Sequence, residues 1–169
     1  MLDAQGFRLN VAIVLIDNED RILLAKRFKQ NAWQLPQGGV NDNEDIVDAL
    51  YRELQEEIGL NKEYVSIIGS TKYWLRYKIP LRMRRETESL FIGQKQKWFL
   101  LRLITDESKI RCDLNAKPEF DAWKWVSYWY PLRVVIDFKK GVYRRALKEL
   151  SQFINNNKKY NQLDYIYLS

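Results

Sequence analysis

The 169-residue sequence predicts a single α/β (α+β) domain in which helices are interspersed among a larger number of strands. Short runs rich in β-branched and aromatic residues recur through the first 126 residues, as expected of strands. Two longer segments are typical of helices. No internal repeat, linker or sharp change of composition occurs before Asn155. We therefore expect a domain over residues 1–154 and a polar, frayed tail over residues 155–169.

The first two strands are expected over residues 8–16 and 21–27. The segment Asp17-Asn-Glu-Asp20 between them has the residues that turns prefer, so it joins the strands. The next segment, Trp33-Gln-Leu-Pro-Gln-Gly-Gly39, is expected to be a loop, because Pro36 and the glycine pair interrupt regular structure.

A helix is expected from Ile46 to Ile58, with Gly59 as its C-terminal stop. Its apolar stripe consists of Val47, Leu50, Leu54 and Ile58. Further strands are expected at about residues 65–70, 72–78, 97–104 and 123–126. A short helix over residues 131–136 has proline in its first turn, and a longer helix follows over residues 142–154.

The composition restricts the chemistry. The sequence has no histidine, which excludes Ser-His-Asp and Cys-His nucleophilic catalysis and every imidazole-ligated zinc or iron site. Its single cysteine, Cys112, excludes an internal disulfide or a multi-cysteine metal site, and we assign it no role. Any bound metal must therefore be held by oxygen atoms, which indicates Mg²⁺ or Mn²⁺.

Neither a membrane span nor an export signal is expected. The longest wholly apolar run is Val11-Ala-Ile-Val-Leu-Ile16, far short of the roughly 20 residues that a membrane span needs. The first six residues lack the basic region and apolar stretch of a signal peptide. We therefore expect a cytoplasmic protein without a membrane partner.

Charge is unevenly distributed along the chain, whose formal net charge is +6. Residues 42–63 include eight acidic and two basic residues, whereas residues 72–102 include nine basic and two acidic ones. Residues 133–148 are again basic, with six such residues against one acidic. A cation-binding centre that handles a polyanion would give this pattern, and solvated faces of mixed charge would give it too.

Three glutamates of the expected helix, Glu53, Glu56 and Glu57, stand at positions i, i+3 and i+4 and project from one arc. Like charges at these spacings repel, and they crowd the helix end where the macrodipole disfavours negative charge. Arg52 alone offers local relief. A divalent cation would be coordinated by such an arc, whereas spacing alone is also compatible with a solvated acidic face.

A longer motif surrounds these glutamates. From Gly38 the chain has five residues, Glu44, seven residues and then Arg52-Glu-Leu-Gln-Glu-Glu-Ile-Gly-Leu60, a span of 23 residues. This motif resembles the complete Nudix box, with every fixed position filled. The resemblance implies a Nudix hydrolase: an α/β/α sandwich with a mixed central sheet that uses Mg²⁺ or Mn²⁺, with more than one ion per site. Its substrate would be a nucleoside diphosphate linked to another group.

The same resemblance implies the roles of individual residues. Glu53, Glu56 and Glu57 match the glutamates that hold the metal ions and activate water. Arg52 matches the residue that orients a glutamate, and the Gly38 carbonyl matches one that often completes a metal shell. Outside the box, Glu119 resembles an extra carboxylate at the metal centre. The expected catalytic residues are Glu53, Glu57 and Arg52, and the expected metal ligands are Gly38, Glu53, Glu56, Glu57 and Glu119.

Segments outside the box resemble a bacterial branch of this family that acts on RNA, the RNA pyrophosphohydrolases. They include Gly6-Phe-Arg-Leu-Asn-Val11, Trp74-Leu-Arg-Tyr-Lys78 and Gly93-Gln-Lys-Gln-Lys-Trp-Phe99. The resemblance implies conversion of 5′-triphosphate or 5′-diphosphate RNA ends to 5′-monophosphate, which promotes mRNA decay. The partner would then be a single-stranded RNA 5′ end, with water as co-substrate.

An RNA end would find suitable contacts here. Phosphates would be contacted by Arg8, Lys95 and Lys97, and hydrogen bonds would come from Gln37, Tyr77 and Gln94. A base near the 5′ end would stack among Arg27, Phe138 and Lys139. Each basic residue is also compatible with ordinary surface charge, and Phe138 with core packing.

Two alternative functions stay open. A dinucleoside polyphosphate hydrolase would use the same centre on a different substrate. A catalytically inactive RNA-binding module is the second, and the intact box argues against it because none of its glutamates is lost. No regulatory protein partner and no oligomeric state follow from the sequence.

Overall fold

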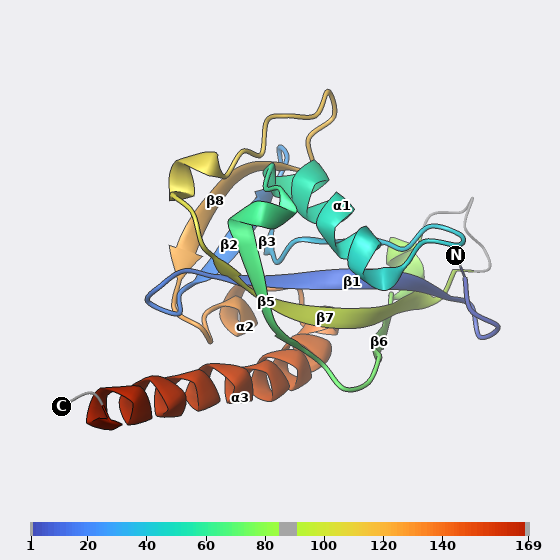
Figure 1. Cartoon of the computed structure of the whole chain (residues 1–169). Coiled ribbons are helices and arrows are strands. Elements are labelled where there is room, and N and C mark those ends of the chain that lie inside the picture. The colour runs from blue at the N-terminus through green and yellow to red at the C-terminus, as the bar shows by residue number, and fades with distance from the viewer. Residues whose placement is uncertain (1, 85–90, 168–169) are drawn as a thin grey trace.

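The computed structural model describes the backbone of residues 2–84 and 91–167, and the side chains through Ile154 (Figure 1). A mixed sheet lies between two helical layers. Helix α1 (Ile46–Ile58) covers one face of the sheet, and the long helix α3 (Asp137–Tyr167) runs across the other. The expected α/β/α sandwich with a mixed central sheet is thus confirmed.

The sheet is built around two long neighbouring strands. Strand β1 (Phe7–Ile16) pairs in parallel with β7 (Gly93–Leu103), from Phe7 opposite Gly93 to Ile16 opposite Arg102. The other strands are β2 (Ile22–Arg27), β3 (Trp33–Gln34), β4 (Gln37–Gly39), β5 (Val65–Ser70), β6 (Leu75–Lys78) and β8 (Phe120–Val126). They pair antiparallel with their neighbours, β5 and β6 along different parts of β7.

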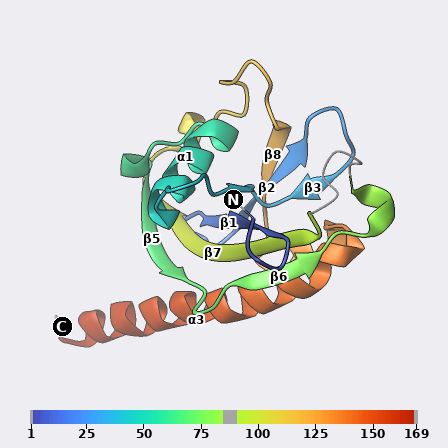
Figure 2. The ribbon, with the colours of Figure 1, turned by 90° about the vertical axis from the view of Figure 1, so that its right-hand side faces the viewer.

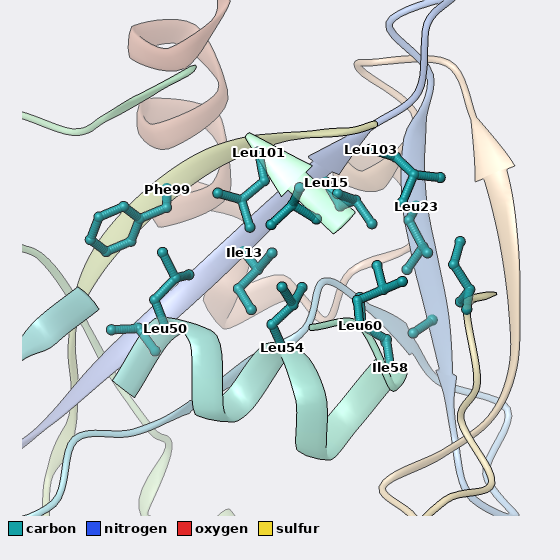
Figure 3. Close-up of a cluster of buried hydrophobic side chains, with 14 of the residues drawn as sticks. Ile13, Leu15, Leu23, Leu50, Leu54, Ile58, Leu60, Phe99, Leu101 and Leu103 are labelled. Carbon is teal, nitrogen blue, oxygen red and sulfur yellow. The ribbon is translucent and has the colours of Figure 1, made fainter. Parts of the chain in front are cut away.

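Alternation along β1 and β7 divides the apolar residues into two cores. Odd-numbered residues such as Ile13 and Leu101 face α1, where they meet Leu50 and Leu54 (Figure 3). Even-numbered residues such as Val14 pack instead against α3. Because successive side chains of a strand point to opposite faces, both sides of these strands are buried.

Helix α1 has the bounds that its sequence predicts. The Asp45 side chain accepts a hydrogen bond from the Val47 N–H at 2.8 Å, which caps the N-terminus. Gly59 ends the helix in the left-handed region at φ 71°, where glycine is favoured. One position of the expected stripe is wrong, since Val47 is exposed.

Several other elements differ from the prediction. The segment expected to be a loop over residues 33–39 contains β3 and β4, because it pairs with β2 and β1 on either side of Pro36. Strand β6 begins three residues later than expected, whereas β7 and β8 begin four and three residues earlier. Helix α2 (Pro131–Val134) has only four residues.

Helix α3 differs most. It starts five residues before the expected Val142, at Asp137, and continues through Gly141, which does not interrupt it; an acidic residue in the first turn favours this start. Its backbone continues through Tyr167, over residues expected in the tail, while residues 168–169 lie outside the described residues. No helix in the described part of the chain is long and apolar enough to cross a membrane.

Candidate active site

A pocket of about 780 Å³ opens beside the C-terminal half of α1. Residues from distant parts of the chain line it: β1 and β7 below, the β3–β4 segment, β6, and the start of α3. Eleven of the residues predicted to form the site line this pocket, namely Arg8, Arg27, Gln37, Gly38, Glu53, Glu57, Tyr77, Gln94, Glu119, Phe138 and Lys139.

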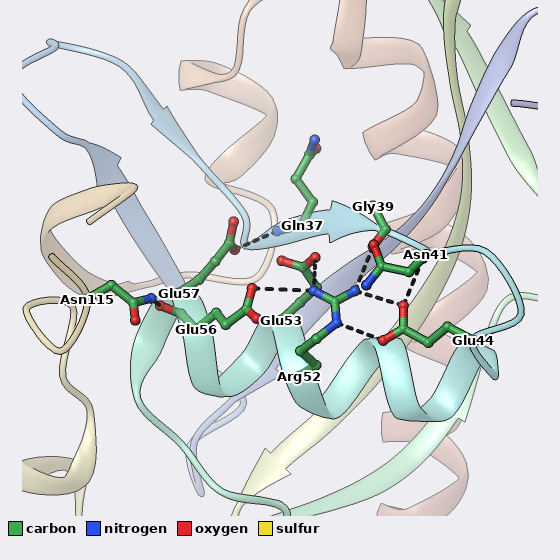
Figure 4. A network of polar contacts seen from close by, with 9 residues as sticks. All are labelled: Gln37, Gly39, Asn41, Glu44, Arg52, Glu53, Glu56, Glu57 and Asn115. Atoms are coloured by element: carbon green, nitrogen blue, oxygen red, sulfur yellow. Dashed lines mark hydrogen bonds and ion pairs between the residues drawn. The ribbon is translucent and has the colours of Figure 1, made fainter. Parts of the chain in front are cut away.

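The glutamates of α1 divide into two groups. Glu53 and Glu57 are buried and line the pocket. Glu56 lies outside the pocket lining and is half-exposed. Arg52 joins the two groups, because its Nη1 donates to Glu53 Oε1 at 2.7 Å and to Glu56 Oε2 at 3.3 Å (Figure 4).

Arg52 also ties α1 to the segment that precedes it. Its Nε and Nη2 donate to the two oxygens of Glu44 at 2.7 and 2.9 Å, and Nη2 donates to the Gly39 carbonyl at 2.8 Å. These bonds from the Arg52 guanidinium lower the pKa of Glu44 to about 2. Arg52 thus contacts three glutamates, Glu44, Glu53 and Glu56.

Burial dominates the electrostatics of the two glutamates in the pocket. Desolvation, with the negative charges of Glu119 and Glu53 nearby, raises the pKa of Glu57 well above its ordinary value of 4.5. Burial also raises the pKa of Glu53, although Arg52 opposes this. The Gln37 backbone N–H donates to Glu57 Oε2 at 2.9 Å and holds that carboxylate at the pocket wall.

Gly38 lies directly against Glu53. A Cβ atom at position 38 would overlap the Glu53 carboxylate, so only glycine allows the backbone to approach it this closely. The box glycine is therefore needed for space at the carboxylates.

The donor chemistry of this side of the pocket fits a hard divalent cation. Glu53, Glu57 and Glu119 all face the pocket and repel one another, and carboxylate oxygens are the ligands that Mg²⁺ and Mn²⁺ prefer. In the described residues, however, no three acidic, cysteine or histidine side chains converge on one point. Glu53 and Glu56 pair with Arg52 instead. Coordination would require these side chains to turn.

The opposite side of the pocket is a neutral network of amides. Gln37 Nε2 donates to Gln94 Oε1 at 3.0 Å, and the Tyr77 hydroxyl donates to the same oxygen at 2.8 Å. The Lys139 ammonium group donates to Gln34 Oε1 at 3.1 Å and to Gln37 Oε1 at 3.4 Å. Burial, with Arg27 nearby, lowers the pKa of Lys139 to about 8, although Glu119 and Glu57 oppose the shift.

The predicted stacking residues also line the pocket. Phe138 packs against Tyr77 with ring centroids 5.7 Å apart, and Arg27 Nη2 lies 4.0 Å from Glu119 Oε1. Arg8 lies beside Gly39 at the pocket rim.

Two predicted phosphate contacts are not brought to this pocket. Lys97 Nζ donates to the carbonyls of Thr71 and Lys72 at 2.5 and 3.2 Å, and Lys95 Nζ lies 3.4 Å from Asp3 Oδ2. The strand period explains the difference, because Gln94 and Gln96 occupy one face of β7 and the two lysines occupy the other. The lysines pair within the fold instead.

Sequence reasoning missed three polar residues here, Asn10, Gln34 and Gln96. All three are buried. Gln96 is fully buried and its Nε2 donates to Asn10 Oδ1 at 2.8 Å. In β7 the amides Gln94 and Gln96 alternate with Lys95 and Lys97, and this period of two is the signal that could have indicated Gln96.

Comparison with known proteins identifies the class to which this fold and these carboxylates belong. The model of the NUDIX domain matches residues 6–147, and the chain therefore belongs to the Nudix family. Nudix hydrolases generally use divalent metal ions. The chain is 58% identical to the RNA pyrophosphohydrolase of Pseudomonas fluorescens SBW25 over 152 residues, which cover 89% of this chain and 96% of that protein. It is 57% identical to the RNA pyrophosphohydrolase of Pseudomonas putida GB-1 over the same shares.

Solved structures of more distant proteins share the fold. An Ap4A hydrolase of C. elegans in a binary complex superposes with a TM-score of 0.64 at 20% identity, covering 88% of this chain and 98% of that one. The dihydroneopterin triphosphate pyrophosphohydrolase of E. coli superposes with a TM-score of 0.65 at 20% identity, covering 89% and 98%. At this identity the likeness shows the fold alone.

Proposed function

We propose that this protein is an RNA pyrophosphohydrolase that acts in the cytoplasm. It converts the 5′-triphosphate or 5′-diphosphate end of a single-stranded RNA to a 5′-monophosphate, with water as co-substrate, and so promotes mRNA decay. The observation that carries the proposal is the composition of the pocket. Buried carboxylates stand on one side, and amide, aromatic and basic side chains stand on the other. Identity of 57–58% to relatives named RNA pyrophosphohydrolase supports RNA as the substrate.

The acidic side would hold more than one Mg²⁺ or Mn²⁺ ion. The ligands would be Gly38, Glu53, Glu56, Glu57 and Glu119. When bound, the cation neutralises phosphate oxygens and makes water acidic enough to attack at neutral pH. Glu53 and Glu57 are the catalytic carboxylates, because they are the box glutamates that are buried in the pocket wall.

The other chain groups act by position and charge. Arg52 fixes Glu44 and the Gly39 carbonyl, so the strand that carries Gly38 stays against α1. Glu57 is held at the pocket wall by the Gln37 N–H and would accept the proton of the attacking water. Arg8 at the rim would contact the phosphate chain.

The nucleoside part of the substrate would lie toward the start of α3. Phe138 and Arg27 would stack a base, and Lys139 lies beside them. Gln37, Tyr77 and Gln94, farther along the pocket wall, would supply hydrogen bonds to the RNA end. Lys95 and Lys97 are not part of this proposal, because they are paired elsewhere in the fold.

The decisive experiment compares two substrates of one reaction type. We expect kcat/KM for a triphosphate RNA with a single-stranded 5′ end to exceed that for diadenosine tetraphosphate. A preference for the dinucleotide would replace RNA by a dinucleoside polyphosphate and leave the hydrolase centre intact. No turnover of either compound in the presence of Mg²⁺ or Mn²⁺ would favour the inactive RNA-binding module.

A further inference from the structure

The amide side of the pocket has a fixed polarity. Its floor, which we call the amide floor, consists of Asn10, Gln34, Gln37 and Gln94. The side-chain oxygen of each of these amides accepts a hydrogen bond from a group within the fold. All four amide oxygens therefore point toward donors within the fold.

Three internal donors hold the oxygens in this orientation. Lys139 donates to Gln34 and Gln37, and Tyr77 donates to Gln94. Gln96, fully buried beneath the floor, donates from Nε2 to Asn10 Oδ1 at 2.8 Å and to Gln37 Oε1 at 3.2 Å. The carbonyl oxygen of Gln96 is left buried without a partner in the described structure, which costs free energy. The fold tolerates this cost while every oxygen of the floor is satisfied.

Three of the four amino groups of the floor consequently face the pocket, whereas that of Gln37 donates to Gln94 Oε1. Those of Asn10, Gln34 and Gln94 donate to no described residue. Among the described residues the buried side-chain atoms without a partner are Arg27 Nε, Gln96 Oε1 and Trp98 Nε1, so none of the three amino groups is enclosed. The floor thus presents hydrogen-bond donors to whatever enters the pocket.

Lys139 makes this polarity difficult to reverse. An ammonium group has three donors and no acceptor, so an amide that faces it must present its oxygen. Lys139 is about nine-tenths buried, and its hydrogen bonds go to the amide oxygens of Gln34 and Gln37. Asn and Gln amides can otherwise turn over and exchange donor for acceptor.

A donor-only surface beside a buried ammonium group matches a ligand that offers only acceptors, and a phosphate group is such a ligand. Gln37 joins this surface to the acidic side, because its backbone N–H binds Glu57 while its side chain binds Gln94. We propose that the amide floor is the subsite for the phosphate that stays on the RNA after cleavage. Gln96, Tyr77 and Lys139 are then positioning residues that fix the direction of the floor amides. This inference rests on the proposed function.

The test compares the binding of two product-like RNAs that differ only in the 5′-phosphate. A short single-stranded RNA with a 5′-monophosphate and the same RNA with a 5′-hydroxyl are titrated, with Mg²⁺ present, by fluorescence anisotropy. The variants are Gln96→Met and Lys139→Met, which remove the donors at similar side-chain length. Tyr77→Phe removes only the hydroxyl group and retains the ring, so it keeps the test valid if a buried substitution fails to fold.

We expect the preference for the 5′-monophosphate RNA to fall about tenfold in Gln96→Met and Lys139→Met, and less in Tyr77→Phe. The KM for triphosphate RNA should rise in Gln96→Met, with kcat changed much less. Lys140→Met is the matched control, because this neighbouring lysine pairs with Asp137 rather than with the floor. Its preference should stay within about twofold of the wild type.

Equal losses for both RNAs would mean that the floor holds the nucleoside, and would overturn the phosphate assignment. Unchanged affinities in all three variants would overturn it as well. The proposed function is tested by a different measurement, the hydrolysis of triphosphate RNA by the wild-type protein. A wild-type protein without this activity would contradict the proposed function, whatever its preference for the 5′-phosphate in the binding experiment.

Discussion

The two sides of the pocket are both largely buried, but one side buries charged groups and the other buries hydrogen-bonded neutral amides. On the acidic side, Glu53 and Glu57 carry like charges out of water, and burial raises the pKa of both. On the amide floor every oxygen has an internal donor and no amide carries a charge. Buried charges are costly unless they are paired, whereas satisfied amides cost little.

The acidic side therefore depends on a bound ligand for its stabilisation, whereas the amide floor does not. The acidic side gains from any cation that offsets its mutual repulsion. The amide floor is organised by the fold itself, through Lys139, Tyr77 and Gln96. Changes of charge, such as cation removal or loss of a carboxylate, should therefore affect the acidic side most. Substitutions that alter how side chains are positioned should affect the amide floor most.

Removal of divalent cations is expected to have the largest effect. Activity should disappear in metal-stripped protein with EDTA, because the sequence has no histidine to serve a nucleophile in a metal-free mechanism. Release of phosphate or pyrophosphate from triphosphate RNA is the measurement, and added Mg²⁺ or Mn²⁺ should restore it. Undiminished turnover in EDTA would contradict the metal mechanism.

Loss of one carboxylate is expected to have the next largest effect. Glu53→Gln or Glu57→Gln should lower kcat by at least about a hundredfold, because each removes transition-state stabilisation worth several kcal/mol. Glu63→Gln, an exposed glutamate of the same acidic segment, is the control and should keep normal kcat. A Glu53→Gln protein with near-normal kcat would show that the acidic side has been misassigned.

Across the pocket, a base-paired 5′ end should be a poor substrate. A stacked base cannot enter between Arg27 and Phe138, and unpairing it costs a few kcal/mol, or roughly ten- to a thousandfold in kcat/KM. Phe138→Ala should weaken turnover of single-stranded RNA by about 1–3 kcal/mol, whereas a dinucleotide substrate should lose much less.

Single-turnover assays on matched RNAs with blunt and single-stranded 5′ ends measure both effects. Tyr73→Ala serves as the control, because Tyr73 is exposed and outside the pocket lining. Equal rates on the two RNAs, with Phe138→Ala like the wild type, would move the substrate assignment to small dinucleotides.

The smallest expected effect is on stability without cations. The elevated pKa of Glu57 means that, above pH 4.5, the unfolded chain ionises first, so the free energy of unfolding falls as pH rises toward the folded-state pKa. Glu57→Gln removes this loss and keeps the acceptor for the Gln37 N–H. We expect a gain on the order of 1 kcal/mol at pH 7–8, or about 3 °C in Tm.

The gain should vanish near pH 4, where the carboxyl group is protonated in both states. Glu53→Gln should gain less, because it gives up the ion pair with Arg52. Thermal unfolding in EDTA at the two pH values is the measurement. A Glu57→Gln protein that is less stable than the wild type at pH 7–8 would contradict the assigned cost of burial.

The acidic side and the amide floor also differ in how well the sequence predicts them. Glu53 and Glu57 of the acidic side lie within one contiguous motif, so the bounds of α1 and the common arc of these glutamates follow from local spacing and caps, whereas Glu119 lies outside that motif. The amide floor joins Asn10 to Gln96 across most of the domain, and no local pattern encodes that pairing. Lys95 and Lys97 were misplaced for this reason, because their face of β7 depends on register with β1.

The parallel pairing of β1 with β7 also has a consequence for the order of folding. The two strands are separated by residues 17–92, so the loop between them must close before they can pair. A chain still emerging from the ribosome can form α1 and can pair β1 with β2 and β4, but β1 lacks β7 until residue 102 is free. A slip of one residue at that moment would place Lys95 and Lys97 beneath the pocket in place of Gln94 and Gln96. An active molecule therefore depends on the pairing of these two strands in the correct register.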